Sequence, residues 1–311
     1  MTAPIVELEG VTKRFGGVTA VDDVSLALHA GRTLGVVGES GCGKSTTARL
    51  IVGLERPSAG ALRFNGTPYG RSGRALRAAR RAIGMIFQDP YESLDARFTV
   101  GDVVAEPLDT HGVRRGERAE RVRELLGSVG MGGIDPEAYP AQFSGGQRQR
   151  IGIARALALD PQLVVCDEPT SALDVSVQAQ ILNLLLELQR ERGVGLLVIS
   201  HDLHVVRRMS DEVAVMYAGM VVEQGPAEAV TRSPRHPYTR ALLDAIPGTS
   251  PAARRLRDRP RAAEGIASAA ATGCPYSTRC PLATDICRAE KPALEGADHR
   301  AACHHAGPAA A

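Results

Sequence analysis

A nine-residue segment near the N-terminus has the composition of a phosphate-binding loop. Residues 38–46 read GESGCGKST, which fits the pattern G-x-x-x-x-G-K-[ST]. Glycines at this spacing let backbone N–H groups converge on an anion, and the start of a following helix adds the positive end of its dipole. The lysine would reach the β- and γ-phosphates, and the serine after it would ligate magnesium. The residues expected to line the loop are Gly38, Glu39, Ser40, Gly41, Cys42, Gly43, Lys44, Ser45 and Thr46.

Two adjacent carboxylates end an apolar run further along the chain. The run Leu163 to Cys166 reads as a buried strand, and Asp167 and Glu168 follow it directly. Such a pair is weak evidence alone, because charged residues often end strands. Combined with a phosphate-binding loop, it predicts that Asp167 holds magnesium through water. Glu168 would then orient and deprotonate an attacking water.

A second candidate anion site lies between these motifs. The segment Ser144-Gly145-Gly146-Gln147 opens a predicted helix, with Ser144 as N-cap and the two glycines exposing the first backbone amides. A capped helix after a Gly-rich turn would explain the segment on its own. Two phosphate-binding helix termini in one chain indicate instead that two chains share their nucleotides.

Strand and helix patterns around these motifs predict a parallel sheet covered on both faces. Strands are expected at 5–8, 24–28, 33–37, 61–64, 83–87, 163–166 and 196–199. Helices are expected at 44–54, 100–107, 117–129, 147–159 and 175–191. Strands that alternate with helices favour a parallel α/β arrangement. The helical stretch from about 90 to 159 interrupts it as an inserted subdomain. The predicted organisation is a phosphate-binding α/β domain over 1–246, a linker over 247–272 and a Cys-rich extension over 273–311.

Composition excludes several classes of protein. The chain has 311 residues, 44% of them hydrophobic, and a net charge of +2, which excludes disorder as its main state. Its apolar runs fall far short of the ~20 residues that a spanning helix needs. The N-terminus lacks the features of a secretory signal, so we expect a protein on the cytoplasmic side. Arginines cluster between Arg71 and Arg81, but a solvated helix face explains them better than nucleic-acid binding.

The motifs together resemble those of the ATP-binding-cassette (ABC) ATPases. The resemblance covers about residues 3 to 230 and rests on the order and spacing of the loop, Gln88, Ser144 to Gln147, Asp167-Glu168, Ser171 to Asp174, and His201. It implies an α/β P-loop NTPase core with an N-terminal antiparallel β region, an inserted helical subdomain and a small Cys-rich C-terminal extension. Phe143 stands where the family usually has leucine, an apolar exchange.

The same resemblance assigns roles to particular residues. Phe15 would stack on adenine, and Gln88 would contact magnesium and the water and signal to membrane subunits. His201 would hydrogen-bond the γ-phosphate. Ser144, Gly145, Gly146 and Gln147 would close on the γ-phosphate of ATP held by the opposite subunit, and Asp174 would cross that interface.

A narrower resemblance is to the ATPases of oligopeptide/dipeptide importers. It rests on Phe87 to Leu108, Cys166 to Gln189, and the segment HPYTRALLDAIP from His236 to Pro247. It implies a subunit that uses ATP and Mg²⁺ to power peptide import from the cytoplasmic face of the membrane. The implied partners are a second, related ATPase, two transmembrane permeases and an extracytoplasmic substrate-binding protein. Nickel or glycoside uptake remains an alternative, as does a soluble ABC ATPase of DNA repair or iron–sulfur assembly.

Four cysteines crowd the C-terminal extension with the spacing C-x5-C-x6-C-x15-C. In a cytoplasmic chain such crowding favours a metal over disulfides. Four thiolates could hold a four-iron, four-sulfur cluster or a zinc ion. The subfamily resemblance favours the cluster, and reduced thiols without metal are the third possibility. The residues concerned are Cys274, Cys280, Cys287 and Cys303.

Overall fold

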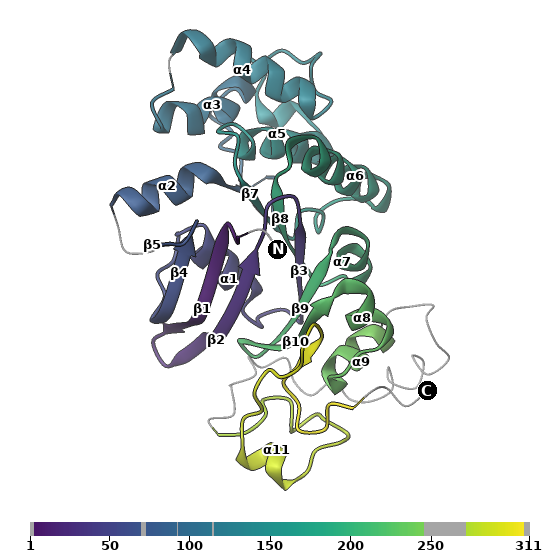
Figure 1. The fold of residues 1–311 in the computed structure, drawn as a ribbon. Coiled ribbons are helices and arrows are strands. Elements are labelled where there is room, and N and C mark those ends of the chain that lie inside the picture. The colour runs from purple at the N-terminus through teal and green to yellow at the C-terminus, as the bar shows by residue number, and fades with distance from the viewer. Residues whose placement is uncertain (1–2, 70–72, 92, 114, 246–271, 308–311) are drawn as a thin grey trace.

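The structure, a computed structural model, describes residues 3–69, 73–91, 93–113, 115–245 and 272–307 (Figure 1). The strands are β1 (Val6–Phe15), β2 (Val18–Leu28), β3 (Thr33–Val37), β4 (Ala59–Phe64), β5 (Thr67–Tyr69), β6 (Ile83–Ile86), β7 (Leu163–Asp167), β8 (Gly195–Ser200), β9 (Glu212–Tyr217), β10 (Met220–Pro226) and β11 (Arg300–Ala301). The helices are α1 (Lys44–Ile51), α2 (Arg74–Ala82), α3 (Val100–Thr110), α4 (Arg115–Ser128), η1 (Pro140–Gln142), α5 (Gly145–Ala156), α6 (Val175–Arg192), α7 (Leu203–Met209), α8 (Ala227–Arg232), α9 (Pro237–Asp244) and α11 (Asp285–Ala289).

A seven-stranded sheet in the order β11-β10-β9-β3-β8-β7-β6 forms the centre of the molecule. The five strands from β9 to β6 are parallel, and β10 and β11 are antiparallel. Strands β3, β7 and β8 are buried along their whole length, as strands covered on both faces must be. Parallel strands present their carboxyl ends at one edge, so the segments that follow β3, β6, β7 and β8 meet there. These segments carry the predicted loop, Gln88, Asp167-Glu168 and His201.

A second sheet, in the order β2-β1-β4-β5, is antiparallel throughout. Its buried side chains, such as Leu8 and Leu62, form one core with Leu50 and Ile51 of α1 and with residues of the central sheet. The antiparallel β region predicted at the N-terminus is confirmed. Strands β1 and β2 are longer than predicted, because both extend to the hairpin that joins Phe15 to Val18.

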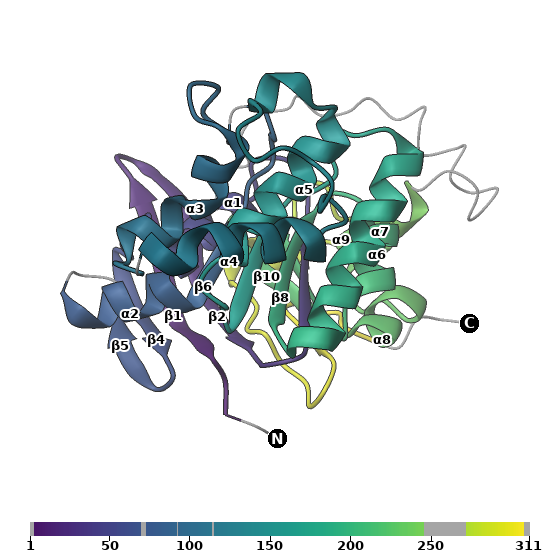
Figure 2. The same cartoon turned by 90° about the horizontal axis from the view of Figure 1, so that it is seen from above.

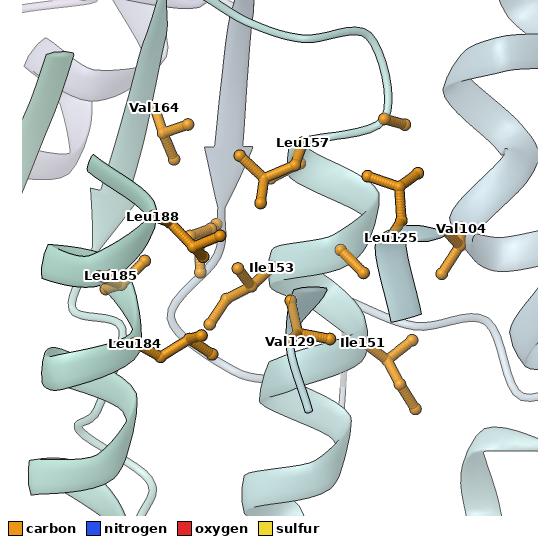
Figure 3. Close-up of a cluster of buried hydrophobic side chains, with 14 of the residues drawn as sticks. Val104, Leu125, Val129, Ile151, Ile153, Leu157, Val164, Leu184, Leu185 and Leu188 are labelled. Carbon is orange, nitrogen blue, oxygen red and sulfur yellow. The ribbon is translucent and has the colours of Figure 1, made fainter. Parts of the chain in front are cut away.

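Helices α3, α4 and α5 form a separate layer beyond the edge strand β6 (Figures 1 and 2). Their apolar faces meet α6 and β7 in one buried cluster, which includes Leu125, Ile153, Leu157 and Leu188 (Figure 3). This cluster ties the helical layer to the sheet, so the start of α5 is carried on a rigid support.

The third helix of the chain ends later than predicted. The sequence predicts that this helix ends at Pro107. In the structure, α3 continues to Thr110 with Pro107 inside it. Proline removes one backbone donor and disfavours a helix interior. Burial of Leu108, which is 3% exposed, supports the last turn. Helices α7, α8 and α9 and strands β9 and β10 were not predicted.

The C-terminal extension packs against the core on the side of β10, at the opposite end from helices α3 to α5 (Figure 1). Its strand β11 pairs with β10, and Cys274, Tyr276 and Cys287 join Tyr217 and Tyr238 in one buried cluster. The predicted linker, 247–272, falls outside the described residues except for its last position. No helix in the described ranges has both the length and the apolar character needed to cross a bilayer.

Candidate functional site

The predicted phosphate loop runs from β3 into α1. Gly43 has a φ of 104°, and a Cβ there would lie 2.3 Å from the carbonyl oxygen of Ala20, so only glycine fits. The Lys44 side chain is buried, at 5% exposure, and curls back over the loop. Its Nζ donates hydrogen bonds to the carbonyl oxygens of Gly38 and Glu39, at 2.8 and 2.9 Å. The only buried ammonium group of the described chain is therefore held by the loop itself, where an anion could recruit it.

The loop is joined to the end of β7. The hydroxyl of Ser45 donates to Oδ1 of Asp167 at 3.0 Å, across a sequence separation of 122. Asp167 is 6% exposed, and this burial raises the pKa of its carboxyl. The bond from Ser45 opposes the rise, neighbouring Glu168 adds to it, and Arg49 and Lys44 oppose it more weakly. A buried carboxylate beside a hydroxyl offers the oxygen ligands that magnesium prefers.

Glu168 is held in place from three directions. Its φ of 47° is unusual for a residue with a side chain and indicates backbone strain. Its N–H donates to the carbonyl oxygen of Ile199 at 3.0 Å, which fixes the backbone. Oε2 accepts a hydrogen bond from Gln88 Nε2 at 3.1 Å and lies 3.3 Å from Nδ1 of His201. The structure thus brings the three residues predicted as catalytic, Gln88, Glu168 and His201, to one point.

Cys42 is packed inside the loop rather than exposed to reagents. Its side chain is 5% exposed, and burial raises the pKa of its thiol. A buried, protonated thiol is a poor nucleophile. The burial of Cys42 favours a tolerated small side chain at this position of the loop over a redox switch.

The predicted second anion site lies at the start of α5. Ser144 is the N-cap: its hydroxyl accepts from the N–H of Gln147 at 3.4 Å, and Gln147 Oε1 accepts from the N–H of Ser144 at 3.0 Å. The predicted N-cap is confirmed. The reciprocal bond was missed, although the spacing S-x-x-Q is the recognised signal of a capping box.

The start of α5 lies against the segment that joins β7 to α6 and against the first turn of α6. A Cβ on Gly145 would lie 3.3 Å from the side chain of Leu173, and one on Gly146 would lie 2.5 Å from that of Val177. Among the hydrogen bonds and ion pairs of the described residues, none joins Ser144, Gly145, Gly146 or Gln147 to the loop of the same chain.

Two further predicted residues lie on the surface. Phe15 is 45% exposed at the end of β1, and the ammonium of Lys13 lies 4.6 Å from its ring centroid. Asp174 is the exposed N-cap of α6, and its side chain makes no capping hydrogen bond. Both side chains are available for contacts outside the chain.

The four cysteines of the extension have free thiols. Cys274 and Cys287 are buried, and the N–H of Cys274 donates to the carbonyl oxygen of Cys287 at 2.8 Å. Burial raises the pKa of Cys274, Cys280 and Cys303, and the neighbouring thiols raise it further. Within the described residues, no three His, Cys, Asp or Glu side chains are arranged to hold a metal ion.

No pattern in the sequence predicts one set of contacts to the loop. Glu39 pairs with Arg279 of the extension, 240 positions away, and its N–H donates to the hydroxyl of Tyr238 in α9. Residues so far apart in the sequence can be associated only through the tertiary structure.

Two family models match the chain. A model described as ABC transporter covers residues 21–171. A model of the oligopeptide/dipeptide transporter C-terminal region covers residues 222–287 and so includes α9 and the first part of the extension.

Curated proteins and solved structures also resemble it. A probable peptide ABC transporter ATP-binding protein of Sinorhizobium fredii is 51% identical over 298 residues, 94% of this chain and 84% of that protein. A di/tripeptide transport ATP-binding protein of Pseudomonas aeruginosa is 46% identical over 96% of this chain and 93% of its own. A dimeric, post-hydrolysis structure of the ATP-binding cassette MJ0796 with ADP and Pi has a TM-score of 0.64 and 31% identity, covering 71% of this chain and 98% of that one.

Proposed function

Because the chain belongs to the ATP-binding subunits of the oligopeptide/dipeptide ABC transporter family, we propose that it hydrolyses ATP to power the uptake of di- or oligopeptides. The observation that carries the proposal is the junction at the carboxyl edge of the central sheet. There the hydrogen bond from Ser45 to Asp167 joins the loop to the carboxylates, and Glu168 lies between Gln88 and His201.

Each residue at this edge has a part in the proposed reaction. Lys44 and the loop amides would bind the β- and γ-phosphates. Magnesium, held by Ser45 and Asp167 with Gln88, would neutralise phosphate charge. The carboxylate of Glu168 would accept the proton of the attacking water. His201 would donate a hydrogen bond to the γ-phosphate.

We propose that the remaining ATP contacts come from other parts of the chain. The exposed ring of Phe15 would stack on adenine. The start of α5 and the exposed Asp174 would act on ATP bound to a second ATPase subunit. The exposed capping box at the start of α5 supports this, as does the dimeric state of the solved relative. We propose that the second subunit is a related but distinct ATPase.

A cavity of about 1100 Å³ adjoins the proposed ATP site. Gln88 and Asp167 line it together with Arg80 of α2, Glu106 of α3 and His111, which follows α3. A segment of a membrane subunit seated here would touch the same Gln88 that contacts Glu168. Membership of the oligopeptide/dipeptide transporter family supports two permease partners, a position at the cytoplasmic face of the membrane, and a substrate-binding protein on the far side.

The test is transport in a reconstituted system. The chain, its partner ATPase and both permeases would be placed in liposomes with the substrate-binding protein. We expect Mg²⁺-dependent ATP hydrolysis stimulated by peptides, and its loss in Lys44→Ala. Stimulation by nickel or glycosides in place of peptides would overturn the substrate class. Hydrolysis that is independent of the permeases would favour a soluble ABC ATPase.

We further propose that the four cysteines of the extension hold a four-iron, four-sulfur cluster. The donor set supports it: the four thiols are free, and neighbouring thiols lie close enough to raise the pKa of Cys274 and Cys303. Their sulfurs would have to draw together, because no ready metal site exists among the described residues. Such a cluster would brace the extension.

The cluster can be tested on anaerobically purified protein. We expect iron and sulfide, with a broad absorbance near ~400 nm. Cys287→Ser should remove both, while Cys42→Ser, outside the extension, should not. Stoichiometric zinc, or four freely titrating thiols without metal, would overturn the proposal.

A further inference from the structure

The C-terminal part of the chain contacts the phosphate-binding loop at Glu39 through both the side chain and the main chain of that residue. Its carboxylate forms a bidentate pair with Arg279 of the extension, with N–O distances of 2.8 and 2.9 Å. Its backbone N–H donates to the hydroxyl of Tyr238 at 2.8 Å. Both the side chain and the main chain of this loop residue therefore depend on elements far outside the loop.

Arg279 is positioned by aromatic rings. Its guanidinium lies 5.9 Å from the ring centroid of Tyr217 and 5.7 Å from that of Tyr276. These rings pack against Tyr238, with centroids 4.6 to 5.4 Å apart. The Arg279 N–H donates to the carbonyl oxygen of Tyr276 at 3.0 Å, which closes a short turn. Contact with these rings restricts the side-chain conformations of Arg279 even without Glu39. Lysine could not reproduce the bidentate pair, because it lacks a planar guanidinium group.

The negative charge of Glu39 links its pairing with Arg279 to the binding of ATP. The side chain is 43% exposed and belongs to the loop that would surround a polyanionic triphosphate. An unpaired carboxylate there would repel the phosphates, and a paired one would not. The pair also keeps the loop in the shape that lets the carbonyl oxygens of Gly38 and Glu39 hold Lys44.

We propose that Arg279 is a positioning residue of the ATP site, so that the Cys-rich extension completes the phosphate-binding loop of its own chain. Arg279 neutralises Glu39, and Tyr238 fixes the backbone of the same residue. The inference rests on the proposed function, since it presupposes that the loop binds ATP. Neither residue contacts Glu168, Gln88 or His201, so displacement of the extension should weaken ATP binding and leave the hydrolysis step unchanged.

The experiment is a double-mutant cycle on the full chain, comparing wild type, R279A, E39Q and E39Q/R279A. The Kd for Mg-ATP is measured on the purified subunit, and kcat and KM on the assembled transporter. We expect R279A to raise Kd and KM roughly two- to fivefold, the effect of a partly exposed charge pair, with kcat unchanged. In the E39Q background, R279A should change neither the Kd nor the KM. R279A should also recover affinity at about 0.5 M salt, because salt screens the unpaired carboxylate.

Two matched controls separate this effect from simple loosening of the extension. Lys291→Ala removes a different contact of the extension to the core, the 2.6 Å pair with Asp22. Arg288→Ala removes a pair with Asp285 within the extension. Neither should change the affinity for ATP. Tyr238→Phe keeps the ring and removes the acceptor of the Glu39 N–H, so it should weaken binding at both salt concentrations.

The outcomes distinguish the inference from the proposed function. If wild type binds ATP and R279A binds equally well, the inference is wrong and the proposed function stands. If R279A is impaired equally with and without E39Q, or Lys291→Ala has the same effect, Arg279 acts only through the stability of the extension. If wild type binds no ATP, both fail.

Discussion

The carboxyl edge of the central sheet and the start of α5 both present a helix N-terminus suited to phosphate, but they are built differently. At the edge, segments after four parallel strands converge, Lys44 and Asp167 are buried, and contacts span more than a hundred positions. At the start of α5, an exposed capping box between Ser144 and Gln147 satisfies itself within four residues.

The difference indicates which of the two sites is complete within one chain. Buried charges at the edge lower stability unless they serve a ligand. The start of α5 has no buried charge that would lower stability, because its proposed function requires only a capped and exposed helix terminus. The edge therefore has the properties of a site within one chain, and the start of α5 has those expected of the surface that we propose completes the site of another subunit.

The largest expected effect tests whether the edge is catalytic. Glu168→Gln should leave ATP affinity unchanged, since glutamine can still accept the hydrogen bond from Gln88. It should lower turnover of the assembled transporter by ~10²–10⁴-fold through loss of the general base. ATPase rates at saturating Mg-ATP provide the measurement. Activity above about a tenth of wild type would place the base elsewhere.

The second prediction tests whether the start of α5 acts on another subunit. Ser144→Arg puts a bulky cation where two subunits should close. ATP affinity of the isolated chain should stay within about twofold of wild type, and turnover of the complex should fall roughly a hundredfold. Nucleotide titration and crosslinking across the ATPase dimer provide the measurements.

Ser144→Ala is the matched control for this substitution. It removes the N-cap, which costs about 1 kcal/mol of stability, without adding bulk. It should allow closure to a larger extent than Ser144→Arg. Weakened ATP binding in the isolated Ser144→Arg chain would show that the motif acts on its own loop.

The smallest expected effect concerns the stability cost of the buried carboxylate. Burial raises the pKa of Asp167, so the folded chain binds this proton more tightly than the unfolded chain does. Ionisation at pH 7 therefore disfavours folding, and stability falls as pH rises through the two pKa values. Asp167→Asn should raise the Tm of the nucleotide-free chain by about 1–3 °C at pH 7. It should also weaken Mg²⁺-dependent ATP binding.

This gain should shrink as the pH falls and should disappear below about pH 3, where Asp167 is protonated in both states. Thermal melts at pH 7 and at lower pH provide the measurement. If Asp167→Asn lowers the Tm at pH 7, the charge of Asp167 is compensated in the folded chain. The buried carboxylate would then not lower the stability of the nucleotide-free protein.

The local parts of the site could be predicted because each is encoded by a few neighbouring residues. The loop needs glycines before a helix, the cap of α5 needs Ser144 three residues before Gln147, and β7 needs an apolar run before Asp167. Expectations that depended on packing were less accurate. The extent of α3 past Pro107 was missed, because burial of Leu108 by distant helices supports its last turn.

The sequence by itself determined which chemical groups the protein carries and the parallel α/β order that brings them to one edge. Only the tertiary structure decided which groups meet: Ser45 with Asp167, Glu168 with Gln88 and His201, and Glu39 with Arg279. The physical reason is the sequence separation over which each kind of interaction acts. Propensity, capping and turn geometry act over a few residues, whereas these pairs are fixed by strand order and by tertiary contacts between segments up to 240 positions apart.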